Sequence, residues 1–286
     1  MWRGMWAVMG VLVLTVMAWA EAPPTFQDAE SMLDALEQAD RGMTTFASSI
    51  VYDRRFMLQD DRHVRTGKLY FQVRGSDGDR LVRAFGVHFD HLLIDNVNRE
   101  ERSAWIFDGE WLVEKRFAQK QYVARQIARP GQRLDPLRLG QGRLPLPIGQ
   151  RKVDILARYD VRLLPPEDGF EPDDPATANY AAFVADAQQL ELTPKPGMGE
   201  DQFRTIRLWY GRLADGRLVP KLSRTIDRKG DEVFVQLIGP RINEPLPEGV
   251  TDITRPAHGT GWDVQIERGR FESDDSDDVG SDKEPS

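Results

Sequence analysis

The feature that most constrains this chain is a long series of short segments in which apolar residues alternate with polar ones. The segments are rich in Val, Ile, Phe, Tyr and Trp, the composition of half-buried β-strands. Turn residues such as Asp60-Asp61, Ser76-Asp77-Gly78 and Asp108-Gly109 separate them. Strands joined by such short turns pair in the antiparallel sense. The first series comprises residues 46–58, 64–74, 81–89, 103–107, 110–117 and 121–127.

A second series of the same kind follows after a long interruption. Its turns are Asp215-Gly216 and Lys229-Gly230-Asp231, and its strands comprise residues 189–193, 203–210, 218–227 and 232–239. Together the two series predict one large antiparallel meander. Because a twisted sheet of this many strands curls on itself, we expect a mainly β (α+β) fold. The expected architecture is an incomplete antiparallel β-barrel, or half-barrel.

A helix is expected over residues 25–42, before the first strand. Thr25 is its expected N-cap, and Gly42 is the expected stop. Its apolar residues follow the spacing of one helical face, and acidic residues occupy the other face. These apolar residues are Ala29, Met32, Leu33, Leu36 and Ala39. We expect this face to cover part of the concave side of the sheet.

The interruption between the two series, residues 128–164, predicts a lid over an apolar cavity. Glycine and proline break any strand here, yet the segment is rich in leucine, which is unfavourable in water. Residues 152–159 predict a short helix, and residues 165–175 an exposed acidic loop. A cover broken by glycine and proline is weakly held, so we expect it to open. The apolar lid residues are Leu137, Leu139, Leu144, Leu146 and Ile148, with Leu134 nearby.

The first twenty residues predict a signal peptide and therefore a periplasmic protein. Arg3 precedes an apolar run, and Ala18-Trp19-Ala20 is a small-x-small ending. This ending favours cleavage after Ala20, with Ala22 as a near alternative. An uncleaved anchor is the other interpretation, although the apolar run is short for a membrane span. The chain has no cysteine, which excludes a lipid-attachment cysteine, a disulfide and a thiolate metal site.

The net charge of −8 belongs mostly to the end of the chain. Residues 257–286 form a C-terminal extension that ends in an acidic tail, which we expect to be a disordered, solubilising end. A docking segment is the alternative. Trp262, Val264 and Ile266 alternate as one strand before the tail. The remaining body is nearly neutral and has no basic face, so we expect no binding of nucleic acid.

Nothing in the sequence indicates an enzyme or a cofactor. The chain has no nucleophile elbow, no phosphate-binding loop and no zinc-protease motif. His88 and His91 are close in sequence but point to opposite faces of a strand, which argues against a metal site. The acidic residues Asp53, Asp90 and Asp95 are expected to be surface or turn residues.

Five motifs lie in order along the chain and span nearly all of residues 25–255. They are Met43-Thr44-Thr45-Phe46, Arg65-Thr66-Gly67-Lys68-Leu69-Tyr70-Phe71-Gln72, Phe107-Asp108-Gly109-Glu110-Trp111-Leu112, Leu190-Glu191-Leu192-Thr193-Pro194-Lys195 and Leu246-Pro247-Glu248-Gly249-Val250. In that order and spacing they resemble the motifs of the LolA family of periplasmic carriers of outer-membrane lipoproteins and their lipid-binding relatives.

The resemblance implies a half-barrel domain over residues 24–256, helical lid segments, an apolar interior for acyl chains, no enzymatic activity and no cofactor. One position departs from the family pattern. The family has an arginine that holds the lid shut, whereas here Val73 falls on that position and Arg74 comes one residue later. Either a local bulge turns Arg74 inward as the lid latch, or the latch is absent.

Alternation along the strands assigns a set of side chains to the inner face. The expected ligand-binding residues are Leu69, Phe71, Val73, Trp105, Phe107, Ile206, Leu208 and Tyr210. Each of them is equally well explained as ordinary core. The function that follows is a monomeric carrier of lipoprotein or lipid acyl chains to the outer membrane, with an inner-membrane lipoprotein-releasing transporter and an outer-membrane acceptor as partners. The alternatives are a periplasmic sensor or regulator using the same half-barrel and a structural lipid-binding protein that never shuttles.

Overall fold

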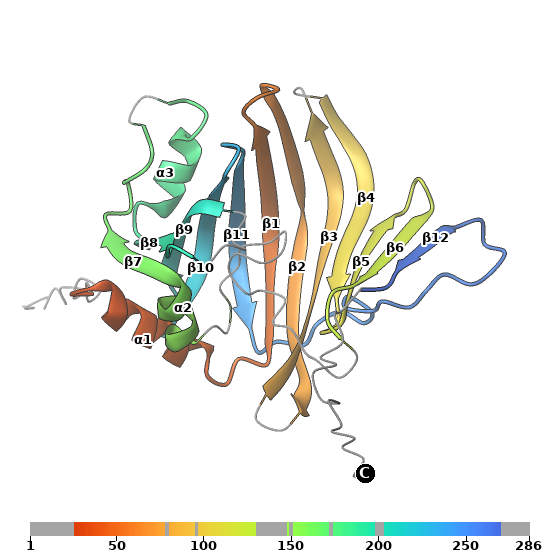
Figure 1. Ribbon diagram of the computed structural model, residues 1–286, viewed down its shortest axis with the longest axis horizontal. Coiled ribbons are helices and arrows are strands. Elements are labelled where there is room, and N and C mark those ends of the chain that lie inside the picture. Colours follow the sequence, from red (N-terminus) through yellow and green to blue (C-terminus); the bar gives the residue numbers. More distant parts are fainter. Residues whose placement is uncertain are drawn as a thin grey trace, which may run out of the picture.

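The computed structural model describes residues 26–77, 80–94, 97–129, 148, 151–171, 174–197 and 203–269. The expected signal peptide, the acidic tail and most of the expected lid lie outside these residues. Within them, every strand belongs to one open sheet of twelve strands (Figure 1). The expectation of an incomplete antiparallel barrel is confirmed, because the sheet does not close. Among the described residues, no helix is long and apolar enough to cross a membrane.

The elements follow the predicted strands closely. In chain order they are α1 (Ala29–Asp40), β1 (Thr45–Phe56), β2 (Asp61–Asp77), β3 (Arg80–Ile94), β4 (Val97–Phe107), β5 (Trp111–Arg116), β6 (Gln121–Gln126), α2 (Lys152–Arg158), β7 (Tyr159–Leu164), α3 (Ala178–Val184), β8 (Gln188–Pro194), β9 (Phe203–Arg212), β10 (Leu218–Asp227), β11 (Glu232–Ile242) and β12 (Asp263–Glu267).

The path of the chain through the sheet differs from a single meander. The order of strands is β12-β6-β5-β4-β3-β2-β1-β11-β10-β9-β8-β7. Two antiparallel series therefore meet where β1 pairs with β11, for example at Ile50 and Leu237. This arrangement buries the edge of β1, which a single meander would leave unpaired. The long connection between β6 and β7 lets the second series begin at the far edge.

Two local expectations need correction, two elements were not predicted, and one expected strand is present with a partner that the sequence did not indicate. The N-cap of α1 is Asp28, not Thr25, because the Asp28 carboxylate accepts a 2.7 Å hydrogen bond from the Ser31 backbone N–H. The helix α2 ends before Tyr159, which begins β7, a strand that we did not predict. The helix α3 was not predicted either. The strand expected around Trp262 is present as β12, but it pairs with β6 in the parallel sense.

One face of the sheet, called here the inner face, is strongly curved. The rings of Tyr52 on β1 and Trp105 on β4 meet with centroids 5.3 Å apart. In a flat sheet, strands three places apart are separated by about 14 Å. Interruptions of the register at Gly67 and Gly75 on β2 and at His91 on β3 accompany this curvature, since bulges increase strand twist. The inner face is therefore concave.

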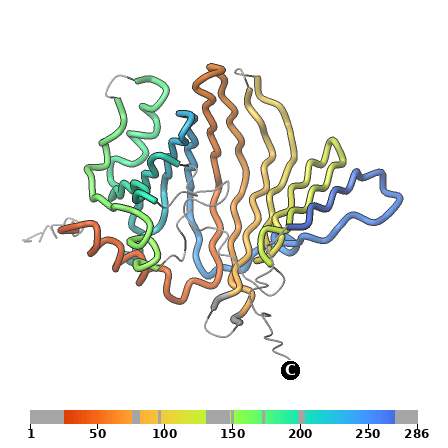
Figure 2. Tube along the Cα trace, in the orientation of Figure 1, coloured from red at the N-terminus to blue at the C-terminus, as the bar shows by residue number. Residues whose placement is uncertain are grey.

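The opposite, outer face is covered at both ends. At the β9–β11 end, α3 packs through Tyr180 and Val184 against Trp209 and Phe234. At the other end, residues 250–253, which we call the C-terminal strap, cross β2, β3, β5 and β6. Figure 2 follows the chain, in blue, from the lower end of β11 to β12 beside β6. The strap and β12 bury a small apolar cluster around Val113.

Candidate functional site

The inner face of β1–β4 and β11 carries the larger apolar surface, called here the first inner cluster. Aromatic rings dominate it: Phe85 stacks on Phe107 at 5.9 Å, and Phe89 meets Trp105 edge to face at 5.0 Å. Val73, Leu112, Val233 and Ile242 pack partly buried around its margin. Its buried members are Met43, Phe46, Ile50, Tyr52, Leu69, Phe71, Phe85, Val87, Phe89, Trp105, Phe107, Ile148, Val235 and Leu237. A concave surface of this composition suits hydrocarbon.

A second inner cluster occupies the inner face of β7–β10. The helix α1 closes it with Met32 and Leu33, and α2 contributes Ile155. The contacts of α1 with α2 and β10 place both helices on this end (Figure 1). Its strand members are Tyr159, Leu190, Leu192, Ile206, Leu208, Tyr210 and Leu218. Burial raises the pKa of the Tyr210 hydroxyl well above its ordinary value, as expected in so apolar a setting.

The residues expected from alternation to face inward fall into these two groups. Leu69, Phe71, Trp105 and Phe107 belong to the first inner cluster, with Val73 at its margin. The other three, Ile206, Leu208 and Tyr210, belong to the second inner cluster, next to α1. The structure thus brings the predicted residues to one face but in two clusters. Whether they bind a ligand stays a prediction.

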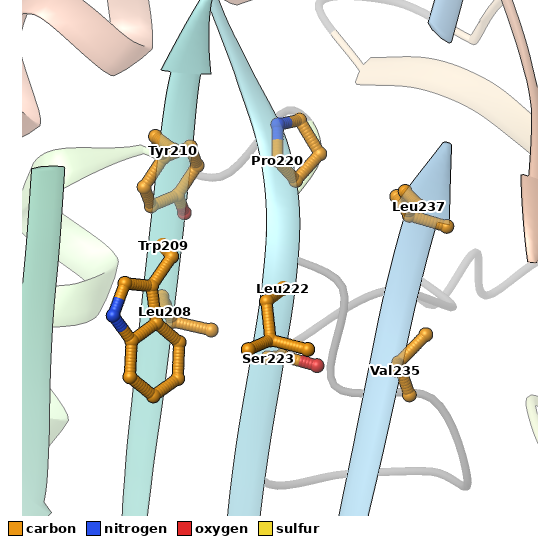
Figure 3. Close-up of a pocket in the computed structure, with 8 residues that line it drawn as sticks. All are labelled: Leu208, Trp209, Tyr210, Pro220, Leu222, Ser223, Val235 and Leu237. Atoms are coloured by element: carbon orange, nitrogen blue, oxygen red, sulfur yellow. The ribbon is translucent and has the colours of Figure 1, made fainter. Parts of the chain in front are cut away.

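A small recess, too narrow for a water molecule, lies beside β10 between the two clusters (Figure 3). Leu208 and Tyr210, both predicted from the sequence, line it. The full lining is Leu208, Trp209, Tyr210, Pro220, Leu222, Ser223, Val235 and Leu237. All but Ser223 are apolar or aromatic. Sequence analysis did not single out Ser223. The signal was there, because Ser223 and Thr225 are two residues apart in an alternating strand and therefore lie on the same face.

Only one of the five expected lid residues is described. Ile148 is 1% exposed and belongs to the first inner cluster. Leu137, Leu139, Leu144 and Leu146 lie outside the described residues, so their placement stays a prediction. Ile148 supplies an apolar contact to the concave face from the segment between β6 and α2.

Arg74 does not reach the inner face. A bulge lies between Val73 and Gly75, as one of the two sequence interpretations required. Arg74 nevertheless donates to the Thr251 backbone carbonyl and, at 2.9 Å, to the Thr251 hydroxyl on the outer face. Arg74 therefore holds the C-terminal strap, and its expected role as a lid latch stays a prediction. The arginine that lies across from Val73 on the neighbouring strand is Arg83, which sequence analysis missed.

The four carbonyls of the C-terminal strap are each held by a side chain from a strand beneath. His88 bonds to the Val250 carbonyl at 2.8 Å, and Lys115 donates to the Asp252 carbonyl at 3.0 Å. Tyr122 donates to the Ile253 carbonyl at 2.7 Å, and Arg74 binds that of Thr251. Gly86 makes room, because a Cβ there would lie 1.9 Å from the Val250 carbonyl oxygen. His88 therefore faces outward as a strap contact.

Charged residues border the apolar part of the inner face where β5 and β6 lie. Arg116 pairs with Glu114 at 2.7 Å, and Arg125 pairs with Glu267 of β12 at 2.8 Å. Further along, burial lowers the pKa of the Arg65 guanidinium. The inner face thus combines an apolar centre with a polar rim, which suits an amphipathic ligand.

Asp53 was expected at the surface, and this expectation is wrong. Its carboxylate is fully buried on the outer face beneath α3. Arg62 donates two hydrogen bonds to it, at 2.8 and 2.9 Å, and the Tyr180 hydroxyl donates a third at 2.7 Å. Buried carboxylates require such partners, so Asp53 anchors α3 to the sheet. In the described ranges, no three histidine or acidic side chains gather as a metal site would require.

The described chain is therefore an open antiparallel half-barrel with an apolar concave face. Comparison with protein-family models and with curated proteins finds no match.

Solved structures do show similarity. A conserved protein from Thermus thermophilus is 14% identical over 84% of this chain and 99% of its own, with a TM-score of 0.40. An outer-membrane lipoprotein-sorting protein domain from Vibrio parahaemolyticus is 11% identical over 77% of this chain and 95% of its own, with a TM-score of 0.37. A LolA superfamily protein from Nitrosomonas europaea is 12% identical over 78% of this chain and 97% of its own, with a TM-score of 0.27.

Proposed function

We propose that this protein binds the acyl chains of lipoproteins or lipids on the concave inner face and carries them through the periplasm toward the outer membrane. The observation that carries the proposal is the curvature that brings Tyr52 of β1 onto Trp105 of β4. This curvature turns one side of an open sheet into an apolar concave face. Such a surface favours hydrocarbon over a polar substrate.

Hydrocarbon alone can supply the binding energy. Burial of an acyl chain contributes about 0.8 kcal/mol for each methylene group. The inner face, which includes Phe71, Phe89 and Phe107, therefore needs to bury only part of one acyl chain to reach useful affinity. Because the sheet is open rather than closed, a bound acyl chain can dissociate again, as a carrier requires. A signal peptide, an inner-membrane donor and an outer-membrane acceptor complete the proposed role.

Two positions on β11 test the proposal, because they lie on opposite faces of one strand. Val233 packs at the margin of the first inner cluster, whereas Ile238 is 44% exposed on the outer face. We expect Val233→Glu to lower the uptake of a diacylated lipid at least tenfold, because the carboxylate would be buried against hydrocarbon. Ile238→Glu should leave uptake unchanged. Native mass spectrometry after incubation with the lipid measures both.

Thermal unfolding of each variant shows whether the fold survives. Equal uptake by the Val233→Glu variant, the Ile238→Glu variant and the natural chain would exclude the inner face as the binding surface. Loss of uptake in the Ile238→Glu variant alone would place binding on the outer face and would also contradict the proposal.

A further inference from the structure

Two hydroxyl residues interrupt the apolar inner face on β10. In register, Ser223 lies between Leu208 of β9 and Val235 of β11. Thr225 lies in the same way between Ile206 and Val233. The side neighbours of both residues are therefore apolar. The two hydroxyls form the seam between the first and second inner clusters.

Both hydroxyls are buried and lack a hydrogen-bond partner in the described chain. Ser223 is 2% exposed and Thr225 is 1% exposed, and neither Ser223 Oγ nor Thr225 Oγ1 makes a hydrogen bond. A buried hydroxyl without a partner is unfavourable, and native structures contain few. Ser48, a buried serine on β1, shows the usual solution, since its hydroxyl donates to the Ile238 carbonyl at 3.0 Å. Alanine or valine would avoid the penalty at both β10 positions.

We propose that Ser223 and Thr225 are the polar subsite of the acyl-binding face and donate hydrogen bonds to the ester carbonyls of a diacylated glycerol. This inference rests on the function proposed above. An ester carbonyl accepts a hydrogen bond but donates none, so it matches a hydroxyl that is otherwise unpaired. It is also the polar group that stands directly at the head of an acyl chain. Free hydrocarbon offers no acceptor, and an ether-linked chain has only its ether oxygen, a weaker acceptor than an ester carbonyl.

The recess beside β10 places Ser223 next to apolar side chains of both inner clusters. Ser223 and Tyr210 are its two hydroxyl-bearing lining residues, and Leu208, Val235 and Leu237 lie around Ser223 (Figure 3). Positions two apart on a strand place their side chains about 6.6 Å apart on the same face. Ser223 and Thr225 therefore offer two donors in line along β10, one for each ester of a diacylated glycerol. The chains themselves would extend over the flanking apolar clusters.

A matched pair of ligands tests the proposal. Dioctanoylglycerol carries two ester carbonyls, and its diether analogue carries the same chains without them. We expect the full chain to bind the diester about three- to tenfold more tightly, the value of one or two hydrogen bonds. The double variant Ser223→Ala/Thr225→Val should bind both ligands equally, with its affinity for the diether unchanged. Competition against an environment-sensitive dye measures all four affinities.

Stability provides the second readout. The double variant should unfold at the same temperature as the natural chain or at a higher one, because it removes unpaired buried hydroxyls. Ser48→Ala, which removes a paired hydroxyl, should lower the unfolding temperature and keep the preference for the diester.

Equal binding of diester and diether by the natural chain would overturn this inference while leaving the proposed function intact. A clear loss of stability in the double variant would also overturn it, because the hydroxyls would then have structural partners. Binding of neither ligand would overturn the proposed function and this inference with it.

Discussion

Tyr52 and Trp105 lie on strands β1 and β4, with two strands between them, yet their rings meet edge to face at 5.3 Å. Phe89 of β3 completes the contact, 6.2 Å from Tyr52 and 5.0 Å from Trp105. Gly67 on the intervening β2 lies close against the backbone of β3, since a Cβ there would lie 1.9 Å from the His88 carbonyl oxygen. The aromatic rings that line the apolar inner face therefore also maintain the curvature of the sheet.

A double-mutant cycle measures this contact. Tyr52→Leu, Trp105→Leu and the double variant each keep an apolar side chain on the inner face. We expect a coupling free energy of about 0.5–1.5 kcal/mol, the range for aromatic pairs beyond the area they bury. Urea unfolding gives the four free energies. A coupling near zero would show that the two rings do not support each other in solution.

Arg74 is predicted to hold the C-terminal strap rather than to act on a ligand. Arg74→Ala should increase amide hydrogen exchange over residues 250–253 and lower the free energy of unfolding by about 1 kcal/mol, the value of a lost hydrogen bond. Lipid uptake should stay unchanged, because the contact lies on the outer face. The control is Arg241→Ala, which removes an exposed pair with Glu244. Altered uptake in Arg74→Ala with normal strap protection would restore the latch interpretation.

Tyr180 gives the fold a dependence on alkaline pH. Burial first, and the Asp53 carboxylate second, raise the pKa of the Tyr180 hydroxyl well above its ordinary value of 10.0. The folded chain therefore keeps this proton at a pH where the unfolded chain releases it. The contribution of Tyr180 to stability is complete below pH 10 and is lost as the pH rises toward the folded-state pKa.

Tyr180→Phe removes this group while keeping the ring that stacks on Phe234 at 4.7 Å. At neutral pH it should lower the free energy of unfolding by about 1–3 kcal/mol, because Asp53 loses one buried hydrogen bond. The difference from the natural chain should shrink as the pH rises above 10. A difference that stays constant in urea unfolding between neutral and alkaline pH would contradict the buried Tyr180–Asp53 bond.

The strands were predictable from sequence because alternation and turn residues are local. β10 lies where the sequence placed it, at Leu218–Asp227. β7 carries the same alternation at Tyr159, Val161 and Leu163, but we assigned Tyr159 to the preceding helix. α3 has apolar residues at helical spacing, Tyr180, Phe183 and Val184, over only seven residues. A helix this short is stabilised by its packing on the sheet, which the local sequence does not reveal.

Long-range partners were not predictable. The pairing of β1 with β11 joins residues almost two hundred positions apart, and alternation does not specify which strand pairs with which. Asp53 has one partner, Arg62, nine residues away in the adjoining strand, and another, Tyr180, 127 residues away. For Arg74, sequence indicated the bulge but not Thr251 as its partner. Alternation assigned the inward-facing residues to the inner face. It did not indicate that they form two clusters, because this division depends on where α1 packs.

The most direct test of the acyl-binding face is native mass spectrometry of the natural chain purified under mild conditions from a bacterial periplasm. We predict a bound mass that dissociates on collision and yields fatty acyl groups, together with its loss in Val233→Glu and its retention in Ile238→Glu. A bare protein mass that stays bare after incubation with diacylated lipid would contradict the account.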